Sequence, residues 1–463
     1  MRARAGGGEE PAIAYNPNLR REPSMNNNHQ RYRDRRSTLL QKMRTQTSGG
    51  LALVPTSPEA VRNRDSHFPY RHDSYSYYLS GFAEPEAVVA LVAGDDGDRQ
   101  ILFCREKNEE REIWDGFRYG PDAAREIFGF DAAHPLSELA AMLPDLASNQ
   151  PALYTPLGLF PAWDRMITEL LNDVRGRART GVSAPEEIVD VRQAVDTMRL
   201  VKDAHETELM RRAAAISSGA HRRAMQHTRP GWFEYQVEAE LAHEFLRYGA
   251  QAVAYPSIVA GGPNACVLHY RSNDRQLQDG ELLLIDAGCE FGSYASDITR
   301  TFPVNGRFTG PQRDVYELVL AAQQACIDAV LPGADFHDYH KVAERVLAQG
   351  YLDLGLCTGT LDEVLESGSY KQFYMHRAGH WLGLDVHDAG LYQVKGASQK
   401  LVPGMVLTVE PGTYIRPADN VPERFWNIGV RIEDDVLVTA SGTENLTAAA
   451  PKTVADVEAA CAR

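Results

Sequence analysis

The chain of 463 residues exceeds what a single hydrophobic core fills, so two domains are expected, and its hydrophobic fraction of 43% is that of an ordinary globular protein. The formal net charge of −15 argues against nucleic acid or an anionic membrane as the main partner, because both require a clustered positive surface. No apolar run reaches the roughly 18 residues of a membrane span, no secretory signal core is present, and the six cysteines lack metal or redox spacing, which favours reduced thiols in the cytoplasm.

The first part of the chain has two sections of different character. Residues 1–30 are rich in Gly, Asn, Arg and Pro with little apolar periodicity, so they are predicted to be disordered. Residues 31–197 are predicted to form the first domain. The basic run 31–44 predicts an opening helix with a solvated basic face, and apolar strands such as 87–93 then alternate with helical stretches such as 137–146. This alternation predicts an α/β domain.

Residues 198–450 are predicted to form the second domain, and residues 451–463 a C-terminal tail. A pair of amphipathic helices, a group of strands, a second helix pair and a second group of strands follow one another. The order of helix pair and strands therefore occurs twice. Six histidines in the helical stretches are predicted to be surface residues: His205, His221, His227, His243, His337 and His340.

Two aspartates of the second domain follow strand-like segments. Residues 282–285 are predicted to form a buried strand, and Asp286 at its end would be costly to bury without a cation or hydrogen-bond donors. Asp297 follows a second short segment. Because Gly288 and Gly292 supply turn chemistry between the aspartates, an antiparallel hairpin would place both carboxylates side by side.

Two glutamates lie on later strands. Residues 405–410 alternate so that Glu410 ends one face of a predicted strand. Residues 430–438 alternate in the same way, which puts Arg431 and Glu433 on one face of a single strand. Both glutamates are therefore candidates for the same polar site as the aspartates.

With His380, these residues give four carboxylates and one imidazole. Four carboxylates brought close together would repel one another, and two divalent cations would neutralise them. Hard oxygen ligands with a single histidine favour manganese, while cobalt, iron and catalytic zinc stay open on ligand type alone. Two metal ions activate a water molecule and polarise a carbonyl, which points to hydrolysis.

Three motifs make the pattern specific: His380-Trp381-Leu382-Gly383-Leu384-Asp385-Val386-His387-Asp388, Glu410-Pro411-Gly412 and Arg431-Ile432-Glu433-Asp434-Asp435. With them, the chain resembles the Xaa-Pro aminopeptidases, also called aminopeptidase P, of the creatinase and methionine aminopeptidase superfamily, peptidase family M24. Matching stretches run from about residue 66 to about residue 446. The resemblance implies an α/β fold (α+β) with an N-terminal creatinase-like α/β domain followed by a catalytic domain of the pita-bread fold.

The resemblance also implies roles for the five ligands, and two divalent metal ions per subunit. Asp286 would bind one ion through both carboxylate oxygens, Asp297 and Glu433 would bridge the two ions, and His380 and Glu410 would complete the second. Glu410 would in addition take the proton of the bridging water or hydroxide as it attacks the peptide carbonyl.

Further residues resemble those that surround the substrate in the family. His376 would shuttle protons or stabilise the tetrahedral intermediate. His269 and His387 would contact the substrate, and Arg431 and Tyr414 would line the same cavity. Taken without the family, the two substrate histidines could be core residues and Arg431 a partner of a neighbouring carboxylate.

One segment departs from the family pattern. Between His376 and His380 the chain carries Arg377-Ala378-Gly379, where the family carries Gly, an apolar residue and Ser. Because the spacing of the two histidines is kept, metal binding is expected to survive. The conformation of the loop at Arg377 stays open.

Trp114 lies in Glu112-Ile113-Trp114-Asp115-Gly116, which resembles the loop that in tetrameric bacterial members reaches the active site of a neighbouring subunit. A homo-oligomer, dimer or tetramer, is therefore expected, with Trp114 as a wall of the substrate site. The alternative is a half-buried tryptophan that packs within its own domain.

Three functions are consistent with these residues. The first is an aminopeptidase that removes the N-terminal residue from peptides with proline in second position. A prolidase would use the same metal site on Xaa-Pro dipeptides only, and the resemblance of the opening domain to aminopeptidase P disfavours it. A catalytically silent peptide-binding protein is disfavoured by the complete set of ligands.

Overall fold

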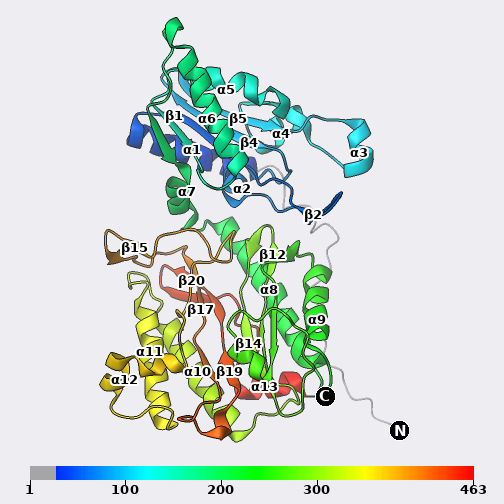
Figure 1. Cartoon of the computed structure of the whole chain (residues 1–463), viewed down its shortest axis with the longest axis vertical. Coiled ribbons are helices and arrows are strands. Elements are labelled where there is room, and N and C mark those ends of the chain that lie inside the picture. Colours follow the sequence, from blue (N-terminus) through cyan, green and yellow to red (C-terminus); the bar gives the residue numbers. More distant parts are fainter. Residues whose placement is uncertain (1–27, 463) are drawn as a thin grey trace. The chain divides into compact units, whose positions relative to one another are not determined.

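The computed structural model of the chain describes residues 28–462, which fall into two compact units (Figure 1). The N-terminal unit holds the described residues up to Val201 together with Ala389–Lys395. The C-terminal unit holds Lys202–Asp388 and the described residues from Gly396 onward. Disorder was predicted for residues 1–30, of which residues 1–27 lie outside the described residues; the prediction is wrong for residues 28–30, which begin a helix.

A six-stranded sheet forms the centre of the N-terminal unit, in the order β6-β5-β4-β1-β7-β8. Its middle strands β1, β4 and β5 are antiparallel, whereas β6, β7 and β8 each run parallel to their neighbour. The strands are β1 (Gly50–Pro55), β4 (Val88–Gly94), β5 (Gly97–Cys104), β6 (Ala132–Pro135), β7 (Ala152–Thr155) and β8 (Glu187–Asp190), with a separate hairpin of β2 (Val61–Asn63) and β3 (Ser66–His67). The helices are α1 (Asn28–Thr47), α2 (Ser74–Ser80), α3 (Glu109–Asp115), α4 (Gly120–Phe128), α5 (Leu139–Ala147), α6 (Pro161–Gly176) and α7 (Val191–Arg199).

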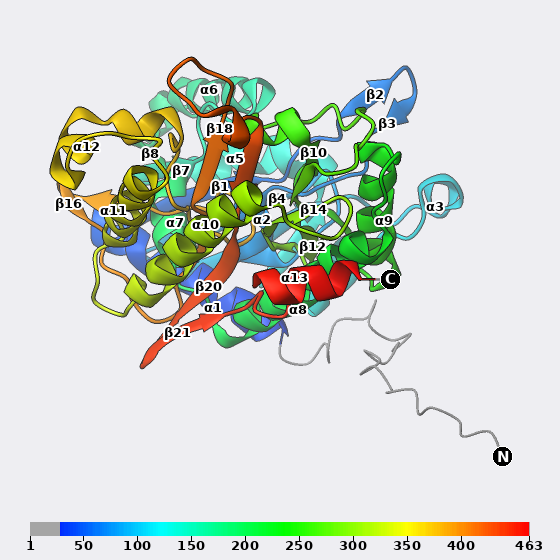
Figure 2. The ribbon, with the colours of Figure 1, turned by 90° about the horizontal axis from the view of Figure 1, so that it is seen from below.

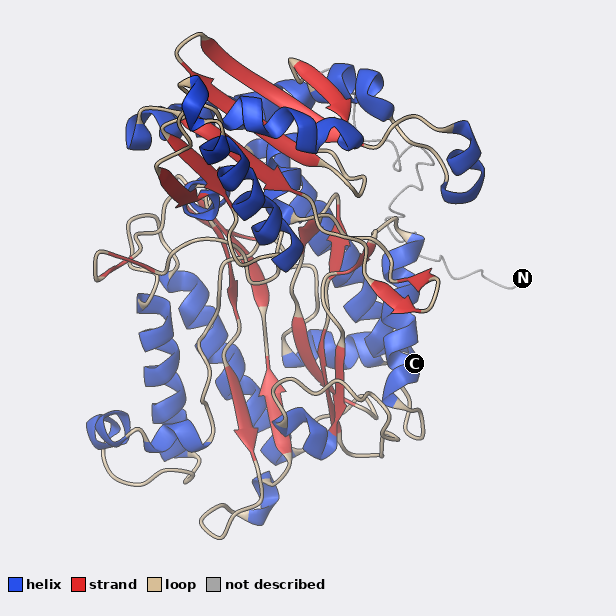
Figure 3. Cartoon of the chain, turned by 45° about the horizontal axis from the view of Figure 1, so that its top comes forward, coloured by secondary structure: helices blue, strands red, loops and turns tan. Residues whose placement is uncertain are grey.

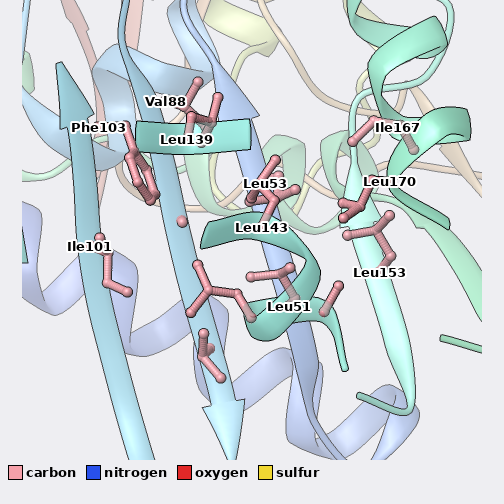
Figure 4. Packing of buried hydrophobic residues seen from close by; sticks show 14 of the residues in the cluster. Leu51, Leu53, Val88, Ile101, Phe103, Leu139, Leu143, Leu153, Ile167 and Leu170 are labelled. Atoms are coloured by element: carbon pink, nitrogen blue, oxygen red, sulfur yellow. The ribbon is translucent and has the colours of Figure 1, made fainter. Parts of the chain in front are cut away.

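Helices α5 and α6 cover one face of this sheet. Leu51 and Leu53 alternate along β1 so that both point to the same face, where they meet Leu143 of α5 and Leu170 of α6 (Figure 4). All four side chains are buried. The predicted α/β pattern is confirmed in this unit, because strands and helices follow the order expected from their apolar periodicity.

Helix α1 is longer than predicted, and its basic side chains are not all solvated. Arg36 is fully buried, and its guanidinium donates to Oε1 of Gln100 at 2.7 Å and to the carbonyl oxygens of Leu79 at 3.0 Å and Gly129 at 2.7 Å. Leu79 lies in the last turn of α2 and Gly129 follows α4, where carbonyl oxygens lack N–H donors within the helix. The prediction of a solvated face is therefore wrong for Arg36.

The C-terminal unit places strands between two groups of helices (Figure 3). Helices α8 (Ala204–His227) and α9 (Glu234–Arg247) pack together on one side, and α10 (Gly310–Ala329), α11 (Asp338–Asp353) and α12 (Leu361–Ser367) on the other. The first strand group is β9 (Ala252–Val253), β10 (Ile258–Gly261), β11 (Leu282–Asp286), β12 (Cys289–Phe291), β13 (Tyr294–Ala295) and β14 (Thr299–Pro303). The second is β16 (Ala397–Ser398), β17 (Val406–Val409), β18 (Gly412–Ile415), β19 (Ile428–Arg431), β20 (Asp434–Thr439) and β21 (Gly442–Asn445). Strand β15 (Gln393–Val394) belongs to the segment Ala389–Lys395 of the N-terminal unit. The predicted order of helix pairs and strands is confirmed.

Residues 451–463, predicted as a tail, contain helix α13 (Val454–Cys461), which packs beside α8 (Figure 2). The Thr453 side chain accepts the backbone N–H of Asp456 and so caps the helix. Val457 and Cys461, one turn apart, are buried. This segment therefore belongs to the packed structure.

All six cysteines are buried and unpaired, as predicted. Among the described residues, no helix combines the length and hydropathy needed to cross a lipid bilayer.

Candidate metal centre

The carboxylates of Asp286 and Asp297 both contact the side-chain hydroxyl of Tyr255. Asp286 ends β11, and the chain returns through β12, β13 and β14, so that Asp286 pairs with Thr299 in the ladder. The Tyr255 hydroxyl contacts Oδ1 of Asp286 at 2.6 Å and also contacts Oδ1 of Asp297. Gly288 permits this return, because a Cβ there would lie 1.8 Å from the Ser296 carbonyl oxygen. The predicted hairpin thus brings the two carboxylates together.

The two glutamates lie where paired strands change sheets. Glu410 separates β17 from β18, and Glu433 separates β19 from β20, while β17 pairs with β20 and β18 with β19. The prediction of one continuous strand over residues 430–438 is wrong. Pro411 has no N–H for the ladder, so the strand breaks after Glu410, and its partner breaks opposite it.

His380 faces this carboxylate cluster through one nitrogen. Its Nδ1 lies 2.9 Å from the Trp381 carbonyl oxygen, an acceptor, so Nδ1 carries a proton. Its Nε2 lies 3.5 Å from Oδ2 of Asp297 and 3.7 Å from Oε1 of Glu410. Asp297, His380 and Glu433 each offer a ligand atom, and these atoms lie within 4.8 Å of one another. This geometry suits a metal ion bound through Nε2.

The electrostatics of the cluster require positive charge. Burial, followed by the charge of Asp297, raises the pKa of Glu433 well above its usual value. Burial also raises the pKa of Glu410 to about 7. Although burial alone would lower the pKa of His380, its contact with Asp297 and the charge of Glu410 raise it to about 9. Divalent cations would relieve this repulsion, so the residues present fit a metal site.

Arg431, Tyr414 and His376 form a chain of contacts beside the carboxylates. The Arg431 guanidinium donates to Oδ2 of Asp286 at 2.6 Å and to the Tyr414 hydroxyl at 2.9 Å. That hydroxyl lies 2.8 Å from Nε2 of His376, whose Nδ1 is 3.9 Å from Oε2 of Glu410. Burial and then the Arg431 charge lower the pKa of His376 to about 3, so its imidazole is neutral. The possibility that Arg431 pairs with a carboxylate is confirmed, because Asp286 is that partner.

Comparison with known proteins decides the family. The profile of metallopeptidase family M24 matches residues 208–440, and that of the aminopeptidase P N-terminal domain matches residues 32–154. The Xaa-Pro aminopeptidase of Escherichia coli (strain K12) is 43% identical over 431 residues, which are 93% of this chain and 97% of that protein. The chain belongs to metallopeptidase family M24.

Solved structures of the M24 family agree over both units. Aminopeptidase PepP of Pseudomonas aeruginosa superposes with a TM-score of 0.91 and 48% identity, covering 94% of this chain and 98% of that one. Zn-substituted Escherichia coli aminopeptidase P in complex with product superposes with a TM-score of 0.90 and 42% identity, covering 94% and 98%. The predicted family and the fold class, an aminopeptidase P N-terminal domain followed by an M24 catalytic domain, are confirmed.

The two predicted substrate histidines, His387 and His269, lie at different depths in the C-terminal unit. The His387 ring lies 4.3 Å from the His380 ring, centroid to centroid, at an interplanar angle of 72°. Burial is the main cause that lowers the pKa of His387 and of His376, and the exposed His269 adds a smaller effect in the same direction. The structure therefore places His387 against His380, while His269 lies on the solvent side.

Trp114 lies on α3, in the N-terminal unit. Its side chain is 83% exposed, and the neighbouring Ile113 is 82% and Phe117 66% exposed. The alternative of a half-buried tryptophan packed within its own domain is wrong, because the seven-residue helix buries none of its residues.

Sequence reasoning missed three supporting residues. Tyr255 carries no local signal, because its contacts form only when β11 and β14 meet. His221 is fully buried, and one ring nitrogen lies 2.9 Å from the Ala287 carbonyl oxygen, so its predicted surface position is wrong. The spacing from Ser217 to His221 along the buried stripe of α8 was the available signal. His340, also predicted at the surface, is only 25% exposed.

Proposed function

We propose that this M24 peptidase is an Xaa-Pro aminopeptidase, which hydrolyses the bond between an N-terminal residue and a following proline. The observation that carries the proposal is the convergence of four carboxylates and the Nε2 atom of His380 in one buried cluster. The relatives named Xaa-Pro aminopeptidase, similar over both units, support the same specificity.

Five residues would hold two divalent ions. Asp286 would bind one ion through both oxygens, Asp297 and Glu433 would be shared, and His380 and Glu410 would complete the second. Bound there, the ions would polarise the peptide carbonyl and lower the pKa of water. Oxygen ligands with a single imidazole favour manganese, and cobalt, iron or zinc would fit the same ligand types.

The protein's own groups would move the proton. Glu410 would accept a proton from the attacking water, as a positioned carboxylate can. It would then deliver that proton to the proline nitrogen as the C–N bond breaks. His376, neutral and hydrogen-bonded to Tyr414, would help to stabilise the tetrahedral intermediate from the side of Glu410.

The side chains around the cluster would hold the substrate. His269 and His387 would face the peptide, while Arg431 and Tyr414 would fix the wall behind Asp286. Trp114 would close the substrate site of a neighbouring subunit in a dimer or tetramer. The reduced cysteines and acidic charge support a cytoplasmic location.

The decisive experiment measures substrate length and metal dependence together. The Mn²⁺-loaded protein should release the N-terminal residue from Xaa-Pro dipeptides and from longer Xaa-Pro peptides, and chelation should abolish both activities until Mn²⁺ is restored. Asp297→Ala removes a ligand shared by two ions, so activity should fall by orders of magnitude. Asp328→Ala, an exposed carboxylate of α10, is the matched control. Turnover of dipeptides alone would favour a prolidase. If the metal-loaded protein cleaves neither kind of peptide, a catalytically silent peptide-binding protein would be favoured.

A further inference from the structure

The loop between His376 and His380 is held on one side by β17. The Glu410 N–H donates to the Ala378 carbonyl at 2.8 Å, and the Thr408 N–H donates to the His380 carbonyl at 2.9 Å. Ala378 is fully buried. Its own N–H is a strong donor that needs an acceptor within the protein.

That acceptor lies on α11. The Ala378 N–H donates to Nδ1 of His340 at 3.2 Å. Because the amide is a donor only, Nδ1 must be unprotonated, and the ring proton sits on Nε2. Nε2 faces Oε1 of Glu344 at 3.5 Å, and this oxygen also accepts from the Tyr370 hydroxyl. Glu344 therefore favours the tautomer of His340 in which Nδ1 can accept the Ala378 N–H.

The next residue of the loop, Gly379, lies so close to its neighbours that the loop cannot shift. A Cβ at Gly379 would lie 1.9 Å from the Thr408 carbonyl oxygen and 2.7 Å from the Tyr339 hydroxyl. Tyr339 and His340 are consecutive on α11, so this helix meets the loop at two successive positions. The glycine at this point of the Arg377-Ala378-Gly379 segment is required by this close approach.

We propose that His340 is a positioning residue of the active site, whose Nδ1 anchors the Ala378 N–H and so directs His376 and His380, two residues to either side. It touches neither the substrate nor the carboxylate cluster and acts through the backbone. The inference rests on the proposed function, which assigns the roles of the two histidines.

Two polar substitutions test whether His340 acts through the hydrogen bond to its Nδ1 or only fills space. In His340→Asn the amide oxygen occupies the place of Nδ1, whereas in His340→Gln the side-chain amide reaches the place of Nε2. The Asn variant should stay within about threefold of wild type, while the Gln variant should lose about tenfold or more in kcat on Ala-Pro-Leu and in Mn²⁺ affinity. His340→Leu, the apolar isostere of the Asn variant, should lose as much as Gln. If the Leu variant does not fold, the Asn and Gln pair decides alone.

Mn²⁺ affinity is measured by calorimetric titration of metal-free protein, so it needs no substrate. If wild type does not cleave Ala-Pro-Leu but the Mn²⁺ affinities of the variants keep this order, the proposed function fails and the anchor stands. Equal kcat and equal Mn²⁺ affinity in the Asn and Gln variants would contradict the proposal that His340 anchors the loop. The matched control is His337→Leu, because Nδ1 of His337 lies 3.4 Å from the guanidinium of the exposed Arg377. A loss of kcat and Mn²⁺ affinity in this control as large as in His340→Gln would also contradict the proposal.

Discussion

The ammonium group of Lys202 lies 2.9 Å from Oδ2 of Asp388, and both side chains are only 1% exposed. The Asp388 carboxylate also accepts the Asp385 N–H at 3.3 Å, and the Asp388 N–H donates to the Trp381 carbonyl at 2.9 Å. This buried ion pair therefore fixes the loop that carries His387, one of the proposed substrate residues.

Lys202→Met should destabilise the protein, because it leaves the Asp388 carboxylate buried without its cation. The expected loss in free energy of unfolding is about 3–5 kcal/mol, measured by urea denaturation. The double variant Lys202→Met with Asp388→Leu removes both charges and should recover part of this loss. A single-variant loss below about 1 kcal/mol would place the pair among weak surface ion pairs and contradict the prediction.

Glu410→Gln tests the proposed base. The glutamine keeps the shape of the side chain and one oxygen donor but cannot accept a proton, so kcat should fall by a factor of about 10²–10⁴. Metal content, measured by mass spectrometry of the purified variant, separates loss of the base from loss of the ions. Wild-type kcat with metal bound would show that another residue is the base.

The stability of the protein should decrease with acidity through His221. Burial lowers the pKa of His221 to about 4, whereas a histidine in an unfolded chain titrates near 6.5. Between these values the unfolded state binds a proton that the folded state excludes, so the free energy of unfolding falls as the pH decreases from about 6.5 to about 4.

His221→Gln isolates this contribution, because its amide can still donate to the Ala287 carbonyl but does not titrate. Between pH 7 and pH 5 the free energy of unfolding should fall about 2 kcal/mol less in the variant than in the wild type, since each pH unit contributes up to about 1.4 kcal/mol. Urea denaturation of the metal-free proteins at several pH values measures the difference. Parallel profiles would contradict the prediction.

Trp114→Ala should weaken the turnover of longer peptides while leaving metal content unchanged, because it removes an aromatic wall and no ligand. Glu410→Gln chains retain Trp114, so they should restore part of the activity when mixed with Trp114→Ala chains. Ile113→Ala, equally exposed beside it, is the control. A strictly monomeric enzyme with full activity on long peptides would exclude the role in a neighbouring subunit.

The proposed carboxylate ligands stand out in the sequence because they interrupt local patterns. Asp286 and Glu410 follow apolar strands, where a carboxylate needs compensation, and that signal is contained in a few neighbouring residues. The break before Glu433 could not be predicted, since it comes from Pro411 on the partner strand. His340 likewise looked like an ordinary helical surface residue, because its burial depends on a loop almost forty residues away.

Tyr255 has a consequence for how the protein takes up metal. A phenol has one proton to donate, yet its oxygen lies against two carboxylates, Asp286 and Asp297. With the pKa of His380 at about 9 and that of Glu433 raised, the metal-free cluster holds several protons at neutral pH. Each cation that binds must expel some of them into solution. Metal loading and acidity therefore compete, and a fall in cellular pH would weaken the binding of metal ions to the cluster.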